Sequence, residues 1–425
     1  MPMNGPLAIC LSAGMALGLA VVIGRKFVEQ GAYPAALAQQ NPTASSVPVD
    51  RSVETAIAQL QQVGREGQGN AAAAQAWQTL VAAGRAAFFP ALRAVREDQP
   101  IAANWLRTAL DAIVEKEQAA GRTLPLAELE AFVTDRRQAP RARFWAYEWL
   151  VQAQPSARDR MLPLCLDDPS LELRRLAIAY ELDRLERSGR ADSRAELERL
   201  FGFARDRDQV DALAQRISQA GGQADVTRHF GFCTHLEWLG PWDAPGSQGY
   251  SLAYPPEKEP LAAGPFRGKD QREIQWQTAE TTDRYGLFDL NKLVGKHKDA
   301  VVFMRAVLRA PQPTPCQIRV TSPTAVKIFL NGEFLFGREE YHHGTNFDAH
   351  IAPATLRAGD NIVLIKVCQN NQQESWAQAW QVQVRICDAT GGPIPALQQV
   401  IRQQNQMRTI PLGARREKDS PLPEK

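Results

Sequence analysis

The 425-residue sequence has almost no excess of charge of either sign. Lysine and arginine number 49 against 47 aspartate and glutamate residues, which leaves a formal net charge of +2. Proteins that bind nucleic acid neutralise phosphates with a strong excess of basic residues on one face. The most charge-rich stretch, 171–199, instead mixes basic and acidic residues in the pattern of solvated helix surfaces. A nucleic-acid partner is therefore not expected.

The sequence also lacks the short motifs that mark common catalytic centres. It has no GxSxG nucleophile elbow, Walker phosphate loop, dinucleotide-binding fingerprint, CxxC pair or CxxCH haem site. Histidine, the side chain best suited to proton transfer near neutral pH, is absent from residues 1–228. The six histidines are at positions 229, 235, 297, 342, 343 and 350. These absences favour a non-enzymatic protein, and no catalytic residue is predicted.

Cysteine is sparse, with six residues in the whole chain. Cys10 lies near the N-terminus, Cys165 lies in a helical pattern, and the other four lie in the last half of the sequence, at positions 233, 316, 368 and 387. Two interpretations stay open. An exported domain pairs some of these thiols, or they are free thiols buried on apolar strands.

The N-terminus carries an uncharged apolar stretch, residues 6–24. Its length and composition are typical of a secretory signal or of a single membrane anchor. A small-x-small cleavage site precedes Gln39, whereas the basic residues follow the apolar run instead of preceding it. Residues 1–38 are therefore predicted to be a signal peptide or an uncleaved anchor, and residues 39–50 a polar linker. Both interpretations place the rest of the protein outside the cytoplasm, in the periplasm or secreted.

Residues 51–225 have apolar side chains every three to four positions, which predicts amphipathic helices. Three helices are predicted to begin at prolines, because the first helical turn has no acceptor for the missing N–H. These prolines are Pro100, Pro140 and Pro169. Helix pairs of this kind bury a face only by stacking, which predicts an α-solenoid of about four irregular repeats. The segment 167–177 resembles the second helix of a HEAT repeat.

Residues 226–393 change to an alternation of period two with turn residues between the runs, which predicts an antiparallel β-sandwich of the jelly-roll type. Asn331-Gly332 is the strongest hairpin signal, because a type I′ turn needs positive φ at both positions. Residues 362–367 are apolar on both faces and predict a central strand. Gln381, Gln383 and Arg385 alternate with apolar residues and predict one solvated face. The expected strands include 300–308, 316–320, 326–330, 333–336, 361–368 and 381–386.

The last residues, 394–425, are predicted to form a short helix over 396–406 and then a disordered, charged tail.

Several motifs of the β region resemble a family of jelly-roll modules in exported bacterial proteins. They are Glu237-Trp238-Leu239-Gly240-Pro241-Trp242, Tyr254-Pro255-Pro256-Glu257, the run from Val326 to Gly332, the run from Leu356 to Val367, and a closing strand at Trp380. Such modules are similar to galactose-binding-like domains and to the sugar-binding domain of family 2 glycoside hydrolases. The resemblance implies a sandwich that binds carbohydrate or packs as an interaction module. Where these modules often carry an acidic pair, this chain has Thr321-Ser322-Pro323-Thr324.

One group of polar and aromatic residues is a candidate ligand site. An indole in a polar loop is suited to stacking against the C–H face of a pyranose ring. The candidate ligand-binding residues are Tyr341, His342, His343 and Trp376. Imidazole and carboxylate groups also suit a structural divalent metal, for which the candidates are His343, Asp348 and His350. The alternative is a polar loop whose side chains only bond the backbone. No other cofactor is expected.

Together these features predict an exported, non-enzymatic binding or scaffold protein of the cell envelope. The helical repeats are expected to bind a protein partner, and the jelly roll to bind carbohydrate or protein. The membrane is expected to be contacted only through the N-terminal segment. Two alternatives stay open: a glycoside-processing hydrolase, and a purely structural component of the cell envelope.

Overall fold

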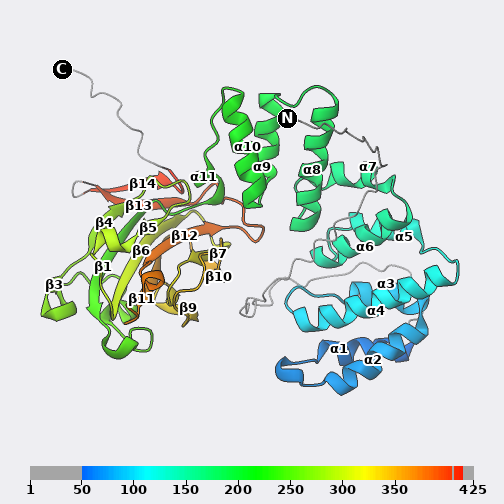
Figure 1. Cartoon of the computed structure of the whole chain (residues 1–425), viewed down its shortest axis with the longest axis horizontal. Helices are drawn as coiled ribbons and strands as arrows, with labels where there is room; N and C mark the ends of the chain where they lie inside the picture. The colour runs from blue at the N-terminus through cyan, green and yellow to red at the C-terminus, as the bar shows by residue number, and fades with distance from the viewer. Residues whose placement is uncertain (1–49, 404–405, 415–425) are drawn as a thin grey trace, which may run out of the picture. The chain divides into compact units, whose positions relative to one another are not determined.

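The computed structural model describes residues 50–403 and 406–414 (Figure 1). The predicted leader, most of the predicted linker, Cys10 and the residues after 414 lie outside the described residues. A helical region is followed by antiparallel β-sheets, which confirms the predicted fold class. The domain boundaries at 225 and 393 stay a prediction. No helix of the described part is both long enough and apolar enough to cross a bilayer.

The helical region consists of short amphipathic helices, of which consecutive members pack together, such as α1 with α2, α5 with α6 and α9 with α10. Their apolar faces form the buried clusters of this region. The helices are α1 (Arg51–Gln61), α2 (Asn70–Ala83), α3 (Arg85–Arg93), α4 (Pro100–Ala119), α5 (Leu126–Thr134), α6 (Pro140–Ala153), α7 (Ala157–Met161), α8 (Leu171–Arg187), α9 (Arg194–Phe203), α10 (Arg207–Gln219) and α11 (Val226–Phe230).

Two of the three predicted proline starts are confirmed, at Pro100 and Pro140, but α8 begins at Leu171 and not at Pro169. The reason is a buried ion pair before the helix. Asp168 accepts two hydrogen bonds from Arg143, at 2.7 and 2.6 Å, and a third from the backbone N–H of Ser170 at 2.8 Å. Ser170 is therefore the N-cap, and Asp168 connects α8 to α6.

The β region is a sandwich of two antiparallel sheets. The larger sheet has the order β14-β13-β6-β11-β8-β9, with β1 paired to β6 and β4 paired to β1, and the smaller sheet has the order β10-β7-β12-β5. The strands are β1 (His235–Asp243), β4 (Gln277–Glu280), β5 (Phe288–Asp289), β6 (Ala300–Ala310), β7 (Thr314–Thr321), β8 (Val326–Leu330), β9 (Glu333–Arg338), β10 (His350–Leu356), β11 (Gly359–Gln369), β12 (Gln381–Cys387), β13 (Gln398–Gln403) and β14 (Gln406–Pro411). A separate ribbon pairs β2 (Phe266–Arg267) with β3 (Glu273–Ile274).

The central strands of the larger sheet, β6 and β11, are buried on both faces. The inner face of this sheet packs against the smaller sheet, where β6, β11 and β8 meet β7 and β12 in one apolar core. Its outer face is covered by side chains of residues 242–276, including Trp242 and Tyr254. This explains why β11, between β6 and β8, is apolar on both faces as predicted. Its one charged core side chain, Lys366, is fully buried and donates to Glu257 at 2.9 Å.

The predicted hairpin at Asn331-Gly332 is confirmed, since both residues have positive φ, 54° and 88°, between the paired strands β8 and β9. The predicted helix over 396–406 is wrong, because this segment begins the hairpin β13–β14. Val400 of β13 pairs with Val307 of β6, and this extension of the sheet outweighs the local helical tendency of a glutamine-rich run. The five described cysteines are buried and free, at positions 165, 233, 316, 368 and 387.

A buried histidine makes the stability of the helical region depend on pH. His229 of α11 donates from Nε2 to the carbonyl oxygen of Ala204 at 2.8 Å, and its ring centroid lies 4.4 Å from that of Phe201. Burial lowers the pKa of His229 to about 4 from 6.5. Between those two values the unfolded chain binds a proton that the folded chain does not bind. Folding stability is therefore expected to fall as the pH falls from about 6.5 to about 4.

We predict that His229→Gln, which keeps a donor for Ala204 but cannot titrate, flattens this pH dependence. Between pH 7 and pH 5 the wild-type protein should lose about 2 kcal/mol more unfolding free energy than the variant. Urea unfolding at the two pH values measures both losses. Parallel pH profiles for wild type and variant would show that His229 is not the responsible group.

Candidate functional site

The four predicted ligand-binding residues lie on two connections between strands of the sandwich. One connection, 339–349, joins β9 to β10, and the other, 370–380, joins β11 to β12. The first carries Tyr341, His342 and His343, and the second carries Trp376. Because β9 and β11 belong to the larger sheet and β10 and β12 to the smaller one, both connections cross from one layer to the other.

Hydrogen bonds join these connections to each other and to a third segment. His342 Nε2 lies 2.7 Å from Oδ1 of Asn370, and an amide oxygen only accepts, so Nε2 is the donor. The backbone N–H of Asn371 donates to Oγ of Ser247 at 3.1 Å. The structure therefore brings His342 and the loop of Trp376 together on one surface, although 34 positions separate them in the sequence.

Trp376 is exposed but firmly held. Its side chain is 61% exposed, in a short 3₁₀ turn, Ser375–Ala377, whose last residue is fully buried. Lys298 Nζ donates to the carbonyl oxygen of Ala377 at 2.7 Å. The ring of His342 meets the indole at a centroid distance of 5.6 Å and an interplanar angle of 80°. Trp376, a candidate ligand-binding residue, is therefore exposed, with His342 packed against one side of its indole.

Most of the other residues in the loop of Trp376 are polar. Gln378 Nε2 donates to the carbonyl oxygens of Gln373 and Glu374, both at 2.8 Å, and so closes the loop. The exposed side chains of Asn371 and Glu374 have no hydrogen-bond partner among the described residues. The loop thus presents an aromatic face together with an amide and a carboxylate that remain available to a ligand.

The other predicted residues lie apart from this surface. Tyr341 is half-buried against the outer apolar cluster of the larger sheet, its hydroxyl is buried without a partner among the described residues, and burial raises the pKa of its phenol. The rings of His343 and His350 are 5.8 Å apart. Asp348 contacts two arginines instead of these imidazoles. The predicted metal set is therefore divided between two places.

The described residues include no group of three or more histidine, cysteine, aspartate or glutamate side chains that could hold a metal ion. A metal in this connection stays a prediction.

Asp348 fixes the far end of the 339–349 connection. Arg385 and Arg319 lie directly opposite each other on β12 and β7, an arrangement of like charges that is unfavourable on its own. Asp348 accepts from Arg385 at 2.6 and 2.5 Å and from Arg319 at 2.6 Å. Burial opposes ionisation of Asp348, yet the bonds and charges of the two arginines hold its pKa below the usual value. Arg385, predicted to be solvated, is in fact only 2% exposed.

The backbone of this connection is strained at two places. His342 and Asp348 have φ values of 57° and 59°, although neither is glycine. Such conformations cost on the order of 1–3 kcal/mol each and persist only where the surroundings enforce them. Here the enforcing contacts are the Asn370 bond at one end and the two arginines at the other.

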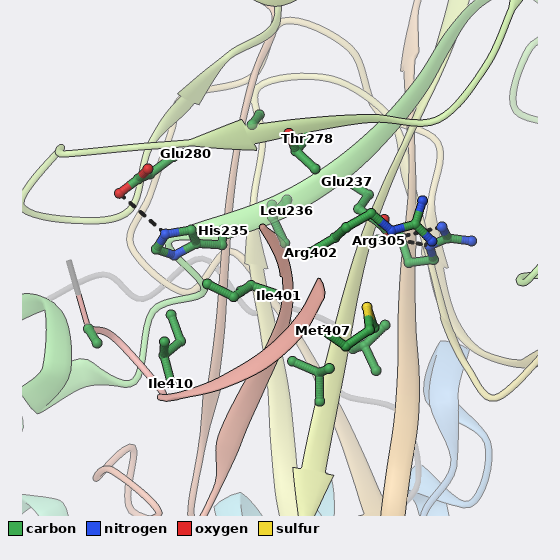
Figure 2. A pocket seen from close by; sticks show the side chains of 14 residues that line it. His235, Leu236, Glu237, Thr278, Glu280, Arg305, Ile401, Arg402, Met407 and Ile410 are labelled. Atoms are coloured by element: carbon green, nitrogen blue, oxygen red, sulfur yellow. Dashed lines mark hydrogen bonds and ion pairs between the residues drawn. The ribbon is translucent and has the colours of Figure 1, made fainter. Parts of the chain in front are cut away.

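β1 and β13 both pair with the same edge of β6. A separate pocket of about 380 Å³ lies where β13 separates from that edge (Figure 2). Figure 2 shows the pairs His235–Glu280 and Glu237–Arg305, which are 3.2 and 2.7 Å apart, on its polar wall. Its apolar lining comes from Val307, Val400, Ile401, Met407 and Ile410, among others. Sequence reasoning missed this pocket, because it depends on the hairpin that was predicted as a helix.

No family model matches the chain, and the comparison with curated proteins finds no match. Among solved structures, the chain is similar to a β-glucosidase from Kluyveromyces marxianus, with 13% identity over 36% of this chain and 16% of that chain, and a TM-score of 0.23. It is also similar to a PA14 sugar-binding domain from an RTX adhesin, with 16% identity over 42% and 96% of the two chains and a TM-score of 0.20.

A third similar structure is an anti-sigma factor domain-containing protein from Clostridium clariflavum, with 7% identity over 44% and 49% of the two chains and a TM-score of 0.21. The chain thus spans only about a sixth of the length of the β-glucosidase. These distant likenesses are to β domains and glycosidase fragments, and at such TM-scores they carry no inference about function.

We predict that Asp348→Asn destabilises the protein by about 3–5 kcal/mol, because it leaves two opposed, buried arginines without their counter-charge. Asp360→Asn is the matched control, since its pair with Arg309 is exposed and should leave the unfolding free energy nearly unchanged. Urea unfolding of the two variants compares them. Equal stability of both variants would contradict the role assigned to Asp348.

Proposed function

We propose that this chain is an exported, non-enzymatic binding protein whose sandwich binds carbohydrate at the surface around Trp376. The observation that best supports the proposal is an indole that is 61% exposed and packs on one side against the ring of His342. The other tryptophans of the β region are buried or half-buried: Trp238, Trp242, Trp276 and Trp380.

The chemistry around the indole suits a sugar. The C–H face of a pyranose packs on an indole, which buries apolar surface on both sides. Asn371 and Glu374 lie in the same loop and offer a donor and acceptors to ring hydroxyls. The backbone of this loop is held by hydrogen bonds before a ligand arrives, which reduces the entropy cost of ordering it on binding.

The helical region has the second role in this proposal, which is to bind a protein. Leu171 and Leu176 of α8 are each 37% exposed, and Leu164 just before this helix is 58% exposed. Stacked helices that leave leucines in solvent offer apolar anchors for a partner.

The alternative of a glycoside-processing hydrolase requires two converging carboxylates. The pocket in Figure 2 contains Glu237 and Glu280, each already paired with a basic side chain. Among the described residues, this pocket is therefore the candidate site for a glycoside-processing hydrolase. Release of reducing sugar from the polysaccharides named below would favour it.

We predict that Trp376→Ala weakens polysaccharide binding about tenfold or more, because the stacking surface is removed. The measurement is affinity electrophoresis of the full chain in gels that contain β-glucan, xylan, galactan or α-glucan. Phe334→Ala is the matched control, since Phe334 is 57% exposed on β9 and should not matter. The proposal fails if no gel retards the wild-type protein. It also fails if Trp376→Ala and Phe334→Ala are retarded to the same degree.

We predict that the mature protein begins at Gln39 if the leader is cleaved, and that it is found outside the cytoplasm in either case. N-terminal sequencing of protein from fractionated cells measures both. Recovery of the intact chain from the cytoplasm alone would contradict export.

A further inference from the structure

His343, in the 339–349 connection, and His350, at the start of β10, share a feature that has no part in the proposed carbohydrate surface. The Nε2 atoms of His343 and His350 are both buried, and neither has a hydrogen-bond partner among the described residues. Buried polar atoms are paired in most proteins, and an unpaired one calls for an ion, a water or a function. Here the two atoms belong to imidazoles whose ring centroids are 5.8 Å apart.

The tautomer of His343 is fixed by its other ring nitrogen. His343 Nδ1 lies 3.0 Å from the carbonyl oxygen of Gly344. A carbonyl oxygen only accepts, so the proton is on Nδ1 and the lone pair of the neutral ring is on Nε2. Histidines that bind metals typically donate their second N–H to a carbonyl or carboxylate in this way. The buried, unpartnered nitrogen of His343 is thus the one that is chemically able to bind a metal.

His350 supplies the second nitrogen. Its side chain is only 4% exposed, and its ring centroid lies 5.8 Å from that of His343 at an interplanar angle of 81°. Two imidazoles that share one Zn²⁺ at Zn–N distances of about 2.0–2.1 Å have ring centres roughly 5–6 Å apart.

The neighbouring charges do not supply a third ligand. Glu340 is bound by Arg338, whose hydrogen bond lowers the pKa of that carboxyl. Asp348 is held by Arg319 and Arg385. A metal here would be bound by two imidazoles from the protein, and its other ligands would be water molecules or an oxygen of a bound molecule.

We propose that His343 and His350 form a two-histidine site for a borderline divalent metal such as Zn²⁺, Ni²⁺ or Cu²⁺. Imidazole nitrogen favours these ions, whereas Ca²⁺ and Mg²⁺ prefer oxygen ligands. The site is independent of the carbohydrate surface, because the Trp376 loop bonds to His342 through Asn370 and not to either of these histidines.

The test uses the full chain without an affinity tag. Isothermal titration with Zn²⁺ should show one site, unaffected by a large excess of Ca²⁺. His343→Asn and His350→Asn should each weaken that site about tenfold or more, since loss of even a supporting contact costs that much. His297→Asn is the control, because His297 lies outside this connection with its Nε2 on the carbonyl oxygen of Val294. It should bind Zn²⁺ like the wild type.

Cu²⁺ provides a second readout that does not depend on affinity. Its electron paramagnetic resonance spectrum should show coupling to two nitrogens in the wild type and to one in His343→Asn, a half-buried position whose replacement disturbs the fold little. The proposal is overturned if no stoichiometric Zn²⁺ site is found, or if the site persists in both His343→Asn and His350→Asn. It is also overturned if His297→Asn abolishes the site. Polysaccharide binding that fails while Zn²⁺ binding persists would reject the proposed function alone.

Discussion

The single carboxylate of Asp348 is the contact on which this end of the sandwich depends. It lies between two arginines that face each other across β12 and β7, and without it their like charges would repel inside a mostly buried sheet. The two arginines need the negative charge of Asp348, and Asp348 contacts them from a backbone conformation with positive φ. The 339–349 connection is therefore pinned to the smaller sheet at the point where β10 is about to begin.

The other end of the connection is pinned to the larger sheet, through His342 and Asn370 just after β11. His342 stands against the exposed indole of Trp376, while His343 turns its lone-pair nitrogen inward. Strain of this kind, balanced by strong contacts elsewhere, is common where a protein prepares a surface for a ligand.

Local sequence patterns predicted the strands well, because alternation and turn chemistry act over a few residues. The strand 326–330 and the Asn331-Gly332 turn follow from residues that lie next to each other. The polar loop around Trp376 singled this residue out among the tryptophans of the β region, and its indole is exposed. Arg385 was misjudged because its partner is 37 positions away, and a strand pattern does not reveal a buried counter-charge.

Tyr341 turned inward because residues 242–276 build an apolar cluster beneath it. Likewise, β13 and β14 formed only because β6 offers an edge, which no local propensity encodes. The errors thus fall where contacts distant in sequence decide the outcome, and these contacts are also the ones that shape the candidate site.

The central claim is that Trp376 is the indole that a carbohydrate meets. Fluorine NMR of the full chain labelled with 5-fluorotryptophan tests it most directly, with the Trp376 resonance assigned from Trp376→Phe. Addition of soluble oligosaccharides from a polysaccharide that retards the protein should shift the Trp376 resonance and leave those of the buried tryptophans in place. A spectrum in which Trp376 stays fixed while another tryptophan shifts would contradict the account.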